Sequence, residues 1–141
     1  MRKFMHEVLG EVCDIENREE RISYLKEHGN DFGIKTILQL CYNDKVVLDL
    51  PKGKPPFEEC PEGRYPSTLK NAIAPISKCV KGNQISRLRK EKFFINILES
   101  VHPEDAAIIC AAKDGTLMNL QNKKYRKITK ALIQATFPEL I

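Results

Sequence analysis

The chain has no tryptophan, and aromatic residues make up only 7% of its 141 positions. Aliphatic side chains must therefore fill most of the core, and a chain of this length buries a core of its own without metal or disulfide support. No apolar run approaches the roughly 20 residues of a membrane-spanning helix. The N-terminus is charged from its second residue and lacks the apolar centre of a signal peptide. We therefore expect a cytosolic protein with no membrane association.

Cysteine and histidine do not occur at the short spacings of a metal site. The five cysteines are widely separated and odd in number, and they include no C-x-x-C pair. The three histidines form no close pair with each other or with cysteine. We predict reduced thiols, no metal ligands and no cofactor.

Catalytic motifs are also absent, including phosphate-binding glycine loops, H-E-x-x-H and G-x-S-x-G. Adjacent acids such as Glu104 and Asp105 diverge by about 100° on a helix and make a poor catalytic pair. The start of a helix explains these two acids by itself, and His102, just before Pro103, is interpreted as structural. We assign no catalytic residue and regard an enzyme as the least favoured function.

Helical periodicity and helix-end signals cover most of the chain. Asp31 and Ser86 are predicted N-caps, His28-Gly29 a left-handed helix end, and Gly115 the end of a nearly all-apolar central helix. Pro75 is expected to divide the helix that contains it. The predicted helices cover residues 4–12, 15–27, 32–43, 68–79, 87–101, 103–113 and 128–136.

A long proline-rich segment separates the two helical halves. Residues 51–66 contain five prolines and two glycines, which propagate neither a helix nor a central strand. Residues 45–50 have no evident partner strand, so we predict an extended arm over 45–66. Phe57 and Tyr65 could pin a structural arm to the core, or the arm could bind a partner.

The fold prediction is therefore all-α: a compact bundle of about six or seven helices with a long Pro-rich extended arm. We expect a single domain over 1–141. It comprises N-terminal helices at 1–44, the arm at 45–66 and a C-terminal helical half at 67–141.

Charge is distributed unevenly along the chain. Residues 1–50 contain 7 Lys/Arg and 10 Asp/Glu, whereas residues 79–141 contain 11 Lys/Arg and 6 Asp/Glu. The basic surplus falls into two clusters: Arg87, Arg89, Lys90 and Lys92, and then Lys123, Lys124, Arg126, Lys127 and Lys130. If both clusters shared one face they would bind DNA or RNA phosphates, and Tyr125 could stack on a base. An acidic protein surface and simple solvation are the other interpretations.

The C-terminal half has a recognisable pattern. Residues 89–106 read R-K-E-K-F-F-I-N-I-L-E-S-V-H-P-E-D-A, A-K-D follows at 112–114, and the chain ends in I-T-K-A-L-I-Q-A-T-F-P-E-L-I. Over about 65–141 this resembles a small uncharacterised family from contractile-tailed bacteriophages, notably those of marine cyanobacteria. The resemblance implies a domain of unknown function acting in the cytoplasm of an infected host cell. It carries over no catalytic or binding residue.

These observations lead to one functional hypothesis and one alternative. We expect a small phage accessory protein that acts by binding, through a basic helical face, to nucleic acid or to a host or phage replication or transcription protein. The alternative is a structural or assembly protein of the virion, suggested by the extended arm and the apolar C-terminal tail. The sequence does not indicate the oligomeric state.

Overall fold

The computed structural model describes residues 4–43, 47–51, 53, 55, 57–58, 73–82, 84–117 and 120–140. The α-helices are α1 (Met5–Asp14), α2 (Arg18–His28), α3 (Phe32–Tyr42), α5 (Arg87–Glu99), α6 (Pro103–Asp114), α7 (Leu120–Lys123) and α8 (Lys130–Thr136). The structure also describes two 3-10 helices, η1 (Ala74–Cys79) and η3 (Pro138–Leu140). This part of the chain is mostly helical and contains no strand, which confirms the all-α prediction.

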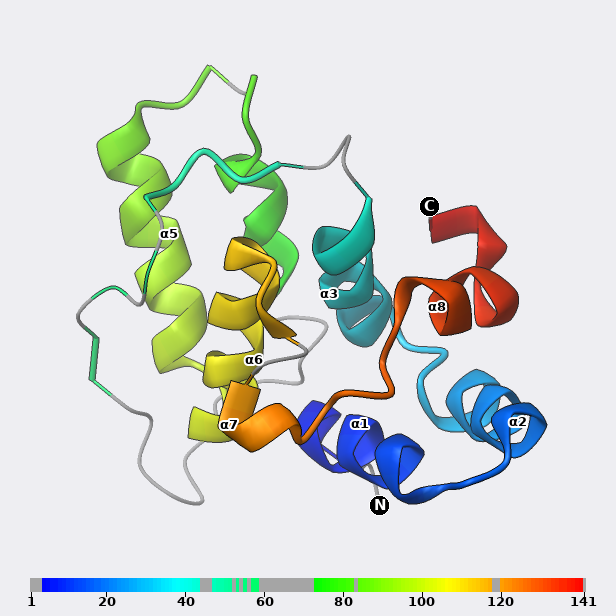
Figure 1. Cartoon of the computed structure of the whole chain (residues 1–141). Helices are drawn as coiled ribbons and strands as arrows, with labels where there is room; N and C mark the ends of the chain where they lie inside the picture. Colours follow the sequence, from blue (N-terminus) through cyan, green and yellow to red (C-terminus); the bar gives the residue numbers. More distant parts are fainter. Residues whose placement is uncertain are drawn as a thin grey trace.

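Helix α6 lies at the centre of the structure, between α3 and α5 (Figure 1). It packs against α1, α3 and α5, because its sequence is apolar nearly all round. Ile108, Ile109 and Ala112 are almost completely buried, and its alanines let neighbouring helices approach closely. The predicted central core helix is therefore confirmed. The buried residues from Met5 to Leu140 form one hydrophobic cluster around it.

Most of the helix ends follow the predicted signals. The Asp31 carboxylate accepts hydrogen bonds from the backbone amides of Gly33 and Ile34, and the Ser86 hydroxyl accepts one from Arg89. Gly115 ends α6 with a φ of 72°, a conformation that favours glycine. These caps are confirmed.

The predicted left-handed helix end at Gly29 is wrong. Gly29 has a φ of −99°, which any residue adopts. A Cβ there would lie 2.8 Å from the carbonyl oxygen of Leu25 and 2.6 Å from its Cδ1. Glycine is needed for space rather than for backbone freedom.

Two predictions between residues 45 and 79 also need correction. Leu48 forms an isolated antiparallel bridge with Val80, and the Asp49 amide donates to the carbonyl of Cys79 at 2.8 Å. The predicted absence of a partner for 45–50 is therefore wrong, because the chain leaves η1 at Val80 in an extended conformation. Within the helix predicted over 68–79, the described residues from 74 onward form the 3-10 helix η1, with proline in its first turn.

Beyond the bridge, the described residues of the proline-rich segment contact the last turn of α6 and then the C-terminal end of α5. The Lys113 ammonium donates to the carbonyls of Pro51 and Gly53 at 2.8 and 3.2 Å. The Gly53 amide in turn donates to the Asp114 carboxylate at 3.0 Å. The last turn of α6 therefore binds two backbone carbonyls and one backbone amide of the segment.

The segment is also attached to the C-terminal end of α5. The Glu58 amide donates to the Glu99 carboxylate at 2.9 Å, and Phe57 packs against the core. These contacts support the structural interpretation of the arm for the residues that are described. Tyr65 and the rest of 59–72 lie outside them, so the arm as a whole remains a prediction.

We expect Gly10→Ala to stabilise the protein by about 0.5–1 kcal/mol, since glycine inside a helix loses more backbone entropy on folding than alanine does. Gly10 lies inside α1, and the nearest atom to an added Cβ is Lys124 Cε at 3.7 Å. Thermal unfolding measures the change. Gly29→Ala is the matched control and should destabilise the protein, since the Leu25 backbone is in the way. A lower midpoint for Gly10→Ala would contradict the packing around α1.

Candidate functional site

The first basic cluster is split by the helix that carries it. Arg87, Arg89 and Lys92 are exposed, but Lys90 is only 1% exposed and lies with Phe94 on the buried face of α5. Its ammonium pairs with a carboxylate oxygen of Asp49 at 3.1 Å. The structure therefore removes Lys90 from the predicted contact face and makes it an internal ion pair.

Packing adds two cations that the sequence reasoning missed. Helix η1 packs against α5, and Lys78 and Lys81, which lie at its end, are exposed. The Lys78 ammonium and the Arg89 guanidinium carbon lie 5.2 and 5.8 Å from the centre of the Phe93 ring. We call the resulting set the α5–η1 surface; its cations are Lys78, Lys81, Arg87, Arg89 and Lys92.

The second basic cluster begins at the end of the short helix α7, which lies outside the predicted helices. Lys123 ends α7 with a φ of 64°, an uncommon left-handed conformation for a residue other than glycine. The chain then turns through Lys124 to Lys127 before α8 begins. We call residues 123–127 the α7 turn. Its exposed cations are Lys123, Lys124 and Arg126, with Lys127 partly exposed and Lys130 exposed on α8.

Tyr125 anchors the α7 turn and has no exposed surface. Burial, together with the negative charges of Glu104 and Asp105, raises its pKa to about 12. Its hydroxyl has no hydrogen-bond partner among the described residues. The structure therefore places the ring in the core, where it cannot stack on a base as the sequence suggested.

The two clusters do not form one face. The N-terminal end of α5 and helix α7 lie at opposite ends of the molecule in Figure 1. Within the described part of the chain, none of the outward-facing cations Arg89, Lys92, Lys123, Lys124 and Arg126 forms an ion pair. The structure therefore holds two separate basic surfaces rather than a single contact face.

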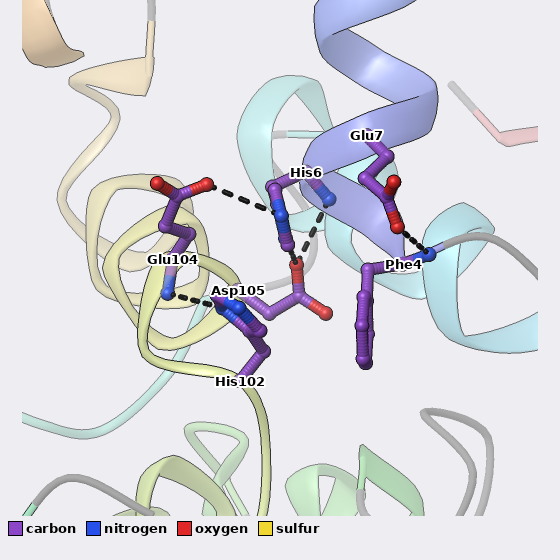
Figure 2. Close-up of polar contacts among 6 residues, drawn as sticks. All are labelled: Phe4, His6, Glu7, His102, Glu104 and Asp105. Carbon is purple, nitrogen blue, oxygen red and sulfur yellow. Dashed lines mark hydrogen bonds and ion pairs between the residues drawn. The ribbon is translucent and has the colours of Figure 1, made fainter. Parts of the chain in front are cut away.

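A different polar cluster joins the N-terminal helix to the centre of the fold (Figure 2). The backbone amide and Nδ1 of His6 both lie 2.8 Å from one carboxylate oxygen of Asp105. Nε2 of His6 lies 3.2 Å from a Glu104 carboxylate oxygen. His102 caps α6 by accepting the Glu104 amide on Nδ1 at 3.0 Å, and its ring lies 4.4 Å from that of His6.

The electrostatics of this cluster favour a protonated His6. Burial by itself would lower its pKa, but the hydrogen bond and charge of Asp105, with the charges of Glu104 and Glu7, outweigh burial and raise the pKa. A protonated ring donates one N–H to each neighbouring carboxylate. Because both ring nitrogens face a carboxylate, the arrangement is suited to linking α1 and α6 rather than to taking a proton from a substrate.

Sequence reasoning missed this link. His6 and Asp105 are 99 positions apart, and no local spacing connects them. The structural interpretation of His102 is confirmed, since its side chain caps α6.

The described residues contain no group of three or more His, Cys, Asp or Glu arranged to hold a metal ion. The described cysteines, at 13, 41, 79 and 110, are all free. Burial raises the pKa of Cys41 to about 12 and that of Cys79 to about 11, so these thiols are poor nucleophiles at neutral pH. Among the described residues, no helix is long and apolar enough to cross a membrane.

Comparison with known protein families gives one result. The model of a family of unknown function, DUF6433, matches residues 8–119. This range includes α5, α6 and the described part of the arm, whereas His6 and the α7 turn lie outside it. Comparisons with curated proteins and with solved structures found no match. Since the family model covers well over half of the sequence, the chain belongs to the DUF6433 family.

Proposed function

We propose that this chain is a small accessory protein of a contractile-tailed bacteriophage that acts by binding an anionic macromolecule through the α5–η1 surface. The partner is nucleic acid or the acidic surface of a host or phage replication or transcription protein. The phage assignment draws on the sequence motifs within 89–106 and at the C-terminus. The place of action would be the cytoplasm of the infected cell.

The observation that carries this proposal is a set of exposed cations on a well-anchored helix. Arg89 and Lys92 have no ion pair within the described part of the chain, while Ser86 caps the helix and Phe94 fixes it to the core. Cations in the first turns oppose the helix dipole, at a cost of about 0.3–1 kcal/mol each. A partner that supplies negative charge would offset this cost, and the rigid helix lowers the entropy lost on binding.

The arm does not add comparable support for the virion alternative. In that alternative the arm would contact a neighbouring subunit. The described residues of the arm instead form hydrogen bonds with α5 and α6 of the same chain. The α5–η1 surface, by contrast, is directed outward. Binding through this surface is therefore the better-supported function.

The test uses two double variants with equal changes in net charge. Arg89→Gln with Lys92→Gln removes two cations from the α5–η1 surface, and Lys123→Gln with Lys124→Gln removes two from the α7 turn. Fluorescence anisotropy with labelled single-stranded DNA, duplex DNA and RNA is measured at about 50 and about 200 mM salt. We expect the first variant to bind at least about tenfold more weakly and the second to change by less than about threefold.

Binding to a protein partner is tested by a second measurement on the same variants. Wild-type and variant chains are immobilised and exposed to infected-host lysate, with and without nuclease. Retention that survives nuclease and disappears in the Arg89→Gln, Lys92→Gln variant indicates a protein partner. Equal losses in both double variants, or no binding in either format, would overturn the proposal.

A further inference from the structure

The outer face of α5 carries apolar side chains as well as cations. Leu88 is 63% exposed, more than any other large hydrophobic residue in the described part of the chain. Leu88, Lys92 and Ile95 follow the spacing i, i+4, i+7 and therefore share one face of the helix. Ile95 is partly exposed and, within the described part of the chain, is not among the apolar residues that pack on the core. Arg89 lies beside this face.

This combination of side chains distinguishes between possible occupants. Nucleic acid phosphates would pair with Arg89 and Lys92. They would leave Leu88 and Ile95 against a charged backbone. Glu91, on the flank of the face, would repel the phosphates. A second copy docked through the same face would bring like charges together. A protein segment that carries both carboxylates and aliphatic side chains satisfies the cations and covers the apolar surface.

We propose that the outer face of α5 docks an acidic amphipathic protein segment, with Leu88 and Ile95 as its apolar contacts and Arg89 and Lys92 as its charge contacts. This inference rests on the proposed function and specifies its partner class. The two apolar residues are two turns apart, so the segment should present aliphatic side chains at a matching separation. Charge complementarity sets the orientation, and apolar burial adds affinity.

A random twelve-residue peptide display library, selected on the immobilised full chain with excess single-stranded DNA as competitor, tests this proposal. Wild-type protein should enrich peptides that combine Asp or Glu with Leu, Ile or Val. Leu88→Ser should lose the aliphatic preference, and Arg89→Gln with Lys92→Gln the acidic one. Phe32→Ser is the matched control, because Phe32 is 54% exposed but begins α3; it should enrich the same peptides as wild type.

The most enriched peptide is then synthesised and titrated by anisotropy. We expect Leu88→Ser to weaken its binding by about five- to tenfold, the effect of losing one partly buried aliphatic side chain, and Phe32→Ser to leave it unchanged. Circular dichroism verifies that each variant is folded. If no acidic-aliphatic peptides are enriched while DNA binding depends on Arg89 and Lys92, this inference fails and the proposed function stands. If neither peptides nor nucleic acid bind, both fail.

Discussion

Asp49→Asn should destabilise the protein by about 2–4 kcal/mol, because it leaves a buried ammonium without its counter-charge. The Lys90 side chain is 2% exposed, and its Nζ lies 3.1 Å from Asp49. Asp49 is itself a third exposed, so solvent screens part of the interaction and the effect falls below that of a fully buried pair. Arg87 is well exposed and its Nε lies 4.0 Å from Asp49 Oδ1, so it contributes little to the stability of this ion pair.

A double-mutant cycle measured by urea unfolding isolates this ion pair. Lys90→Met removes the buried charge and keeps most of the side-chain volume, so Asp49→Asn should cost much less in the Lys90→Met background. Lys92→Met is the matched control, since Lys92 is exposed on the same helix; it should leave the cost of Asp49→Asn unchanged. Additive effects of Asp49→Asn and Lys90→Met would show that the pair contributes nothing.

Disruption of the His6–Asp105 link should have an effect of similar size. Asp105→Asn replaces a buried carboxylate oxygen that accepts both the amide and Nδ1 of His6, and we expect a loss of about 2–4 kcal/mol. The loss should be largest at low pH, where His6 is protonated and donates to the carboxylate. Urea unfolding at several pH values measures it.

The pH dependence of this link has a definite sign. The pKa of His6 is raised in the folded state, so its stabilising contribution is complete below the unfolded value of about 6.5 and is lost as the pH rises through the folded value. The acidic groups that act on the ring are Glu7, Glu104 and Asp105, and the His102 ring lies 4.4 Å away. Tyr125, with a pKa of about 12, does not titrate in this window.

Comparison of His6→Gln with His28→Gln tests this sign. His28 is exposed at the end of α2 and serves as the control for replacing a histidine outside the link between α1 and α6. Between about pH 6 and about pH 8.5, wild type and His28→Gln should lose stability, and His6→Gln should lose clearly less. If the stability of His6→Gln has the same slope as that of wild type, His6 is not the group that couples stability to pH.

Local sequence signals predicted the helices well, because these signals act within a few residues. Asp31 and Ser86 cap their helices as expected, and the apolar character of 103–113 placed α6 at the centre. The missed start of α2 has the same local origin: Asn17 caps it by accepting two backbone amides. The prediction of a left-handed helix end at Gly29 was wrong because glycine is required there by the close contact with Leu25. Backbone preference alone does not indicate such a contact.

The candidate site was less predictable. Composition and spacing identified the two basic clusters but not which way each side chain points. Lys90 and Tyr125 are neighbours of exposed cations in sequence, and both are buried in the fold. The pairing of Lys90 with Asp49 spans 41 positions, and such a pairing leaves no mark in the local pattern.

The sequence alone determined the helical class, most of the helix ends and the basic surplus of the C-terminal half, since periodicity, capping and charge are properties of short segments. Only the tertiary structure decided that the two clusters are separate, that Lys90 is internal, and that His6 links α1 to α6. Each of these depends on where helices far apart in sequence pack together, and packing is set by the whole core at once.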